Sequence, residues 1–125
     1  MALNEFEEAL KNTDEIEISV TGRKSGLRIS NTVWFVQEAD RLYLLPVKGS
    51  DSDWYKNILK TSMMRLNAGG KEWIADVTPV TDKGKVRDIA EKFRTKYGAD
   101  QVKKYYSKFD VAVEVSFSGM QRRTA

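Results

Sequence analysis

Apolar and polar residues alternate along much of this chain, and the alternation predicts a protein built largely from β-strands. Ile16, Ile18 and Val20 are separated by polar neighbours, which indicates a strand with one buried face. The same reasoning predicts five further strands, at residues 28–38, 41–47, 63–67, 72–80 and 111–117. Short turns join most of the neighbours, so adjacent strands are expected to be antiparallel.

Other segments carry apolar residues at helical spacing. Helices are predicted at residues 3–12, from about Asp82 to Tyr97, and again through residues 102–109. A shorter helix is expected at residues 53–60, with Ser52 as its N-cap. Gly98 is expected to end the long helix, because glycine tolerates the left-handed backbone found there.

About six strands linked mostly by hairpins, with helices at the beginning, middle and end, predict an α+β fold. The simplest arrangement is a small antiparallel barrel whose openings are covered by helices. The chain shows no internal repeat and no Pro/Gly-rich linker, so residues 1–125 are expected to form a single domain.

Composition narrows the class of protein. Of the 125 residues, 41% are hydrophobic and 31% are charged, which is typical of a folded domain in water. No apolar run approaches the ~18 residues of a membrane-spanning helix. The first residues, MALNEFEEALK, are acidic and unlike a secretory signal, so a cytoplasmic location is expected.

The sequence contains neither cysteine nor histidine. Disulfides, thiol nucleophiles, imidazole bases and the usual zinc sites are therefore excluded, and no metal site is expected. The remaining side chains do not carry electrons between substrates, so any redox activity requires a bound cofactor.

The net charge of +3 is unevenly distributed, because residues 82–108 hold nine basic side chains and four acidic ones. This excess is compatible with an anionic partner. Nucleic-acid-binding proteins usually have a denser basic face, so nucleic acid is not the expected partner. A non-catalytic module that binds nucleic acid through this segment stays open as an alternative.

The first segment that could carry chemistry is TGRKSG, residues 21–26, followed by Arg28. Its two glycines permit unusual backbone angles, and consecutive amides in such a turn can bind an anion. Arg23, Lys24 and Arg28 add cationic donors suited to phosphate or carboxylate. The alternative interpretation is a basic turn that is merely solvated.

The second segment is VKGSDSDWYKN, residues 47–57. It combines a flexible loop, Lys48, and the Trp54–Tyr55 pair at a helix start, where exposed amides favour an anion or a polarised carbonyl. The two aromatic rings could stack on a ring system. Alternatively, Trp54 caps the barrel core and Tyr55 is half exposed.

A third group consists of Tyr97, Tyr105 and Tyr106. Their spacing indicates that most of them belong to the core. A tyrosine with an ordinary pKa of ~10 is protonated at neutral pH, so one that lined a pocket could donate a proton.

Together these segments resemble the deazaflavin-dependent nitroreductase family. The resemblance rests on TGRKSG at 21–26, VWFV at 33–36, RLYLLPVKGSDSDWYKN at 41–57 and VAVEV at 111–115, and it spans about residues 14–117. It implies a split β-barrel related to the FMN-binding oxidases. It also implies coenzyme F-420, an 8-hydroxy-5-deazaflavin with a phosphate and an oligoglutamate tail.

The resemblance further implies an oxidoreductase that transfers a hydride to a small electron-poor acceptor, such as a quinone, an enone or a nitroaromatic compound. The residues that match its cofactor-binding positions are Arg23, Lys24, Ser25, Gly26, Arg28, Trp34, Lys48, Gly49, Ser50, Trp54, Tyr55 and Asn57. Tyr97 and Tyr55 are the candidate catalytic proton donors. The family commonly reads Gly-x-Pro-Arg after the turn. Arg28 is displaced from that arginine by one residue, which on a strand places it on the opposite face.

Two alternatives remain open at this level. One keeps the fold and replaces the cofactor, giving an FMN-binding, pyridoxamine-oxidase-like enzyme. The other is a non-catalytic module that carries the deazaflavin. A homodimer is expected in either case.

Overall fold

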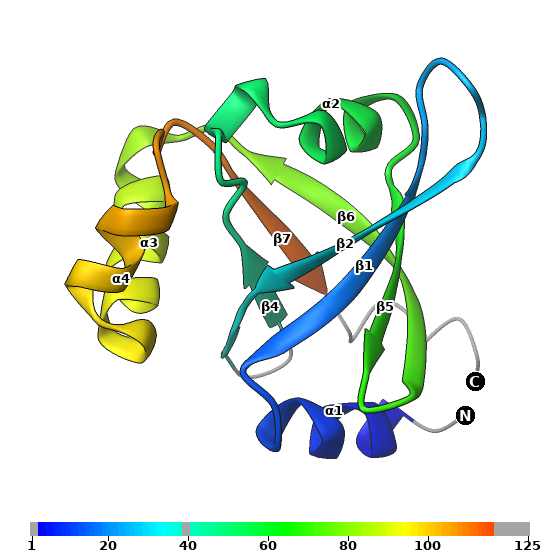
Figure 1. Cartoon of the computed structure of the whole chain (residues 1–125), viewed down its shortest axis with the longest axis horizontal. Coiled ribbons are helices and arrows are strands. Elements are labelled where there is room, and N and C mark those ends of the chain that lie inside the picture. The colour runs from blue at the N-terminus through cyan, green and yellow to red at the C-terminus, as the bar shows by residue number, and fades with distance from the viewer. Residues whose placement is uncertain (1–2, 39–40, 117–125) are drawn as a thin grey trace.

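The computed structural model describes residues 3–38 and 41–116, which form one sheet and its covering helices (Figure 1). In chain order the elements are α1 (Leu3–Lys11), β1 (Glu15–Thr21), β2 (Arg28–Trp34), β3 (Val36–Glu38), β4 (Arg41–Leu44), a 3-10 turn η1 (Gly49–Asp51), α2 (Asp53–Lys60), β5 (Met63–Ala68), β6 (Lys71–Val80), α3 (Lys83–Tyr97), α4 (Ala99–Tyr105) and β7 (Ala112–Ser116). The predicted turn at 39–40, the end of the last strand at Phe117 and the tail from Gly119 lie outside the described residues.

The strands follow the order β2-β1-β5-β6-β7-β4-β3, and all neighbours are antiparallel. The two edge strands, β2 and β3, are separated in the chain by Phe35 alone. Because one continuous segment supplies both edges, the sheet curls into a split barrel. The predicted α+β split barrel with covering helices is confirmed, with seven strands instead of about six.

The extra strand comes from a break at Phe35, and the prediction of one strand over residues 28–38 is wrong. The side chain of Phe35 is buried, and side chains of α3 bind its backbone in place of a neighbouring strand. The Phe35 amide donates to the Tyr97 hydroxyl at 3.1 Å, and its carbonyl accepts from Lys96 Nζ at 2.8 Å. These two bonds allow the segment to leave one sheet edge and join the other.

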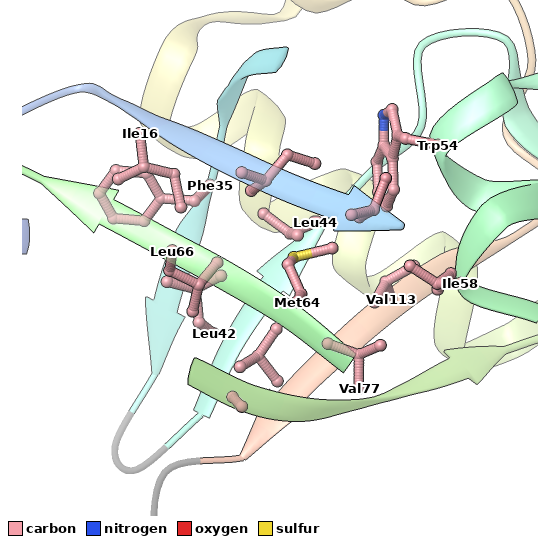
Figure 2. Close-up of a cluster of buried hydrophobic side chains, with 14 of the residues drawn as sticks. Ile16, Phe35, Leu42, Leu44, Trp54, Ile58, Met64, Leu66, Val77 and Val113 are labelled. Carbon is pink, nitrogen blue, oxygen red and sulfur yellow. The ribbon is translucent and has the colours of Figure 1, made fainter. Parts of the chain in front are cut away.

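The core follows from the alternation of the strands. Ile16 and Ile18 of β1 point inward, while Glu15 and Glu17, which alternate with them, are exposed. Figure 2 shows Ile16 of β1, Leu66 of β5 and Phe35, which lies between β2 and β3, gathered in one buried cluster. A second cluster lies between the sheet and the pair α3–α4 and includes Val86, Ile89, Phe93, Val102 and Tyr106.

Helices cover the two ends of the barrel (Figure 1). α1 packs against β5 and β6 at one end, while α2 lies at the other. α3 begins after Asp82, whose carboxylate accepts from the Lys85 amide at 2.9 Å, and ends at Gly98 with φ of 96°. The predicted helix ends at both places are confirmed. None of the helices in the described ranges is long and apolar enough to cross a membrane.

Candidate functional site

A cleft of about 630 Å³ opens between the turn at 21–26, β2 and the segment that leads into α2. We call it the lysine cleft, after Lys24 and Lys48 in its wall. Six of the predicted cofactor-binding residues line it: Arg23, Lys24, Ser25, Lys48, Trp54 and Asn57. Two motifs separated in sequence by a hairpin therefore converge on one site.

Arg23 attaches the turn to α2. Its backbone amide and its guanidinium both donate to Asn57 Oδ1, at 3.0 and 2.8 Å, and Asn57 is buried. The guanidinium also pairs with Asp53 at 3.4 Å, and Lys60 Nζ donates to the Arg23 carbonyl at 2.9 Å. The Arg23 guanidinium is therefore largely compensated by Asn57 and Asp53, so this residue mainly positions the turn.

Lys24 and Lys48 differ from Arg23 in this respect. Both side chains are exposed, and within the described part of the chain neither ammonium group has an ion-pair partner. The two acids in the same wall are already paired, Asp51 with Lys108 at 3.1 Å and Asp53 with Arg23. The lysine cleft thus presents two uncompensated positive charges to a ligand.

The loop that carries Lys48 is held by Asp110, a residue that sequence reasoning missed. Asp110 accepts from both the amide and the hydroxyl of Ser50, and Lys108 Nζ bridges Asp110 at 3.6 Å and Asp51 at 3.1 Å. Gly49 has φ of 58°, and a Cβ there would lie 2.1 Å from Asp110 Oδ1. Gly49 and Ser50 therefore shape the loop instead of lining the cleft.

The pKa of Asp110 reflects this environment. Burial pushes the pKa of its carboxyl upward, but the two hydrogen bonds from Ser50 and the Lys108 charge outweigh burial, so the net pKa lies below the usual value. No local sequence signal marks Asp110, because it contacts a loop 60 residues earlier in the chain.

Trp54 and Tyr55 are buried at the start of α2. Trp54 is 7% exposed and packs in the core near Ile58, with the rest of its surface in the wall of the lysine cleft (Figure 2). This burial agrees with the alternative in which Trp54 caps the core. Tyr55 is 3% exposed, so the expectation of half exposure is wrong; burial first, then the nearby charge of Asp110, raises its pKa.

A second cleft of about 400 Å³ lies beside the first, and we call it the aromatic cleft. Its wall includes Glu15, Trp34, Gln101, Tyr105 and Tyr106. Thr32 and Val33 of β2, together with Val47, line both clefts. The two clefts therefore meet at the outer edge of β2. Of the predicted cofactor-binding residues, Trp34 is the one found in the second cleft.

Tyr97 lies behind Trp34. The two rings stack at 4.2 Å and 7°, and Tyr105 contacts the Trp34 ring edge-on at 5.5 Å. Besides accepting from the Phe35 amide, the Tyr97 hydroxyl lies within hydrogen-bond distance of the carbonyls of Asp14 and Phe35, at 2.8 and 2.9 Å. Burial raises the pKa of Tyr97 to about 12 against the opposing effect of the Phe35 hydrogen bond. Its proton is thus engaged by backbone, and its ring supports the aromatic cleft from behind.

Gly26 and Arg28 lie outside both clefts. Gly26 has φ of 73°, and its amide closes the turn by donating to the Gly22 carbonyl at 2.9 Å. Arg28 pairs with Thr21 at the start of β2 and is exposed, whereas the next residue, Ile29, lines the lysine cleft. The displacement of the arginine by one residue therefore removes it from the wall, as strand geometry requires.

The described residues hold no group of three or more acidic side chains that could bind a metal ion.

A family model described as "Uncharacterized protein conserved in bacteria (DUF2255)" matches residues 7–115 of the chain. The chain belongs to the DUF2255 family. No curated protein matches it.

Solved structures similar to this DUF2255 chain share its fold at low sequence identity. One is an F420-H2-dependent reductase (FDR-A), with a TM-score of 0.64 and 16% identity over 82% of this chain and 94% of that one. Another, described as a domain-swapped dimer, has a TM-score of 0.65 and 15% identity over 90% and 95%. A Listeria innocua protein provisionally assigned as a pyridoxamine 5'-phosphate oxidase has a TM-score of 0.66 and 9% identity, covering 90% of each chain. These likenesses establish the split-barrel fold.

Proposed function

We propose that this protein is an oxidoreductase that binds coenzyme F-420 in the lysine cleft and reduces a small electron-poor acceptor. The observation that carries the proposal is the pair Lys24 and Lys48. Two exposed ammonium groups, from two separate motifs and without ion-pair partners among the described residues, face the same cleft. A phosphate and several carboxylates on one ligand would compensate both charges.

The cleft fits the parts of that coenzyme in a definite division of roles. We assign the anionic tail to Lys24 and Lys48, with the Ser25 hydroxyl as a further donor. That hydroxyl accepts from the Leu27 amide at 3.1 Å, which leaves its own proton to donate to a ligand. We assign the ring system to the region where the two clefts meet, near Val47.

When bound, the coenzyme would supply the hydride, which none of the protein's side chains can provide. The chain contributes position and electrostatics. Asp110 and Gly49 fix the Lys48 loop, and Arg23 with Asn57 fixes the turn, so the backbone that carries both lysines is positioned before the ligand arrives. Tyr97 and Tyr55 stay predicted proton donors only, since neither lines a cleft and the Tyr97 hydroxyl is bonded to backbone carbonyls.

The structural neighbours support both cofactor hypotheses. The FDR-A structure is named as an F420-H2-dependent reductase, which favours the deazaflavin. The Listeria innocua structure favours the alternative, an FMN-binding enzyme on the same fold. The two cofactors differ in their anionic groups, since FMN has one phosphate and no glutamates. The cationic wall of the lysine cleft is the reason for preferring the longer tail.

The experiment is a fluorescence titration with coenzyme F-420 at several salt concentrations. The Debye screening length is about 8–10 Å near physiological ionic strength and shortens as salt is added. Raising the salt concentration should therefore weaken binding of the anionic coenzyme to the wild type. Lys24→Ala and Lys48→Ala should each lower the affinity and flatten its salt dependence. Lys103→Ala is the matched control, because this exposed lysine of α4 lines neither cleft. An unchanged salt slope in both cleft variants would contradict the proposal.

Turnover separates an enzyme from a carrier. On the proposed function, the reduced coenzyme is oxidised when menadione, an enone or a nitroaromatic compound is added to the protein. Binding of the coenzyme without oxidation by any of these acceptors would favour the carrier.

The expected homodimer belongs to the proposal as well. The neighbour described as a domain-swapped dimer supports it. Sedimentation velocity at micromolar concentration should show a dimer, and a monomer at every concentration would contradict this.

A further inference from the structure

The aromatic cleft has a chemical character different from that of the lysine cleft. Its wall combines the rings of Trp34, Tyr105 and Tyr106 with a single charged side chain among the described lining residues, Glu15. The lysine cleft, which meets it at Thr32 and Val33, carries the uncompensated lysines. Two adjoining compartments therefore have opposite charge.

The position of Glu15 makes its charge effective inside the aromatic cleft. Glu15 and Trp34 are directly paired across β1 and β2, so their side chains lie on the same face of the hairpin. Within the described residues, Glu15 has no ion-pair partner. The pKa of Tyr97, whose ring lies behind Trp34, is raised mainly by burial. The charges of Asp14 and Glu15 raise it further by smaller amounts.

The rings define a shape as well as a charge. Trp34 is held flat against Tyr97 with the rings 7° from parallel, and the Tyr105 ring stands at 81° to it. Aromatic faces in this arrangement favour a flat, apolar ring system over an extended or bulky ligand. The cleft volume of about 400 Å³ is at the lower end of the range for small-molecule sites.

We infer that the aromatic cleft binds flat aromatic compounds that are uncharged or cationic, and that Glu15 is the residue that disfavours anionic ones. The identity of these compounds as the hydride acceptors rests on the proposed function. The binding preference itself does not, because it follows from residues that lie outside the lysine cleft.

The test uses three naphthoquinones that differ in charge: menadione, 1,4-naphthoquinone-2-sulfonate and a trimethylammonium-substituted naphthoquinone. Calorimetry gives their affinities for the whole chain, with and without oxidised coenzyme F-420. The sulfonate should bind about fivefold or more weakly than menadione, since a like charge at short range costs affinity. The cationic compound should bind at least as well as menadione, and high salt should narrow the differences.

Glu15→Gln should bring the sulfonate to within about twofold of menadione by removing the repulsion. Glu17→Gln is the matched control: it is exposed on the same face of β1, two residues along, and lines neither cleft, so it should leave the ratio unchanged. Tyr105→Ala should weaken all three compounds, and Tyr105→Phe should restore them. Tyr105 is 50% exposed, so its removal leaves the core intact.

Equal affinity for the sulfonate and menadione in the wild type would overturn the inference. So would a Glu15→Gln variant with an unchanged ratio, or the absence of quinone binding in both coenzyme states. Charge-selective quinone binding without coenzyme binding would uphold the aromatic cleft and refute the proposed function. Coenzyme binding without quinone binding would do the reverse.

Discussion

The hydroxyl of Tyr97 accepts a hydrogen bond from the backbone amide of Phe35 at 3.1 Å, across 62 residues of sequence. This bond lies at the point where β2 ends and β3 begins. It supplies a partner for a buried amide that has left one sheet edge and not yet joined the other. The end of α3 therefore stabilises the seam of the split barrel.

Tyr97→Phe is expected to destabilise the protein by about 1–3 kcal/mol, because it leaves the buried Phe35 amide without its partner. Chemical denaturation followed by fluorescence measures the change. If Tyr97 is instead a proton donor, the variant would retain its stability and lose turnover with reduced coenzyme, and that result would contradict the structural role.

Alkaline pH should reduce the contribution of Tyr97 to the stability of the fold. The pKa of Tyr97 rises to about 12 in the folded protein, whereas an unfolded tyrosine has a pKa of ~10. A raised acid pKa stabilises the fold below the unfolded pKa, and this stabilisation is lost as pH rises through the folded value. The stability difference between wild type and Tyr97→Phe should therefore shrink from pH 9 to pH 11 in denaturation experiments; a constant difference would refute this.

Gly49→Ala should damage the Lys48 loop in two ways. Its φ of 58° disfavours any side chain, and the new Cβ would lie 2.1 Å from Asp110 Oδ1. We expect loss of coenzyme affinity together with a stability loss above about 1 kcal/mol. Gly70→Ala is the control for backbone strain alone, because Gly70 has φ of 82° and a Cβ added there would meet nothing within 4 Å. Similar coenzyme affinity in the two variants would contradict a role for Asp110 in holding the loop.

Trp54→Ala is expected to lower stability by about 3–5 kcal/mol, since the ring is 7% exposed and fills the core next to α2. Thermal melting without coenzyme measures this directly. A melting temperature close to the wild type, with turnover lost, would show instead that Trp54 serves mainly the ligand.

The sequence predicts most elements of this fold because each depends on local periodicity. The inward set Ile16 and Ile18 and the helix ends at Asp82 and Gly98 are examples. The break at Phe35 could not be predicted in this way. It depends on Tyr97 and Lys96, whose positions relative to Phe35 exist only in the folded chain.

The candidate site also contains residues that local motifs predict and residues whose role depends on the folded chain. The convergence of Lys24 and Lys48 follows from two recognisable motifs, and both line the cleft. Asp110 is absent from any local pattern, because it acts on the loop from a bend that precedes β7, 60 residues later in the chain. The sequence leaves two interpretations of Trp54 open, a ring-stacking residue and a cap on the core, and the packing of α2 on the barrel favours the cap.

The measurement that tests the central claim most directly is the affinity of the purified protein for coenzyme F-420 relative to FMN, each titrated by fluorescence in the same buffer. The account predicts that the deazaflavin binds at least about tenfold more tightly, equivalent to roughly 1.4 kcal/mol, because its longer anionic tail engages both lysines. Equal affinity for the two cofactors, or tighter binding of FMN, would contradict it.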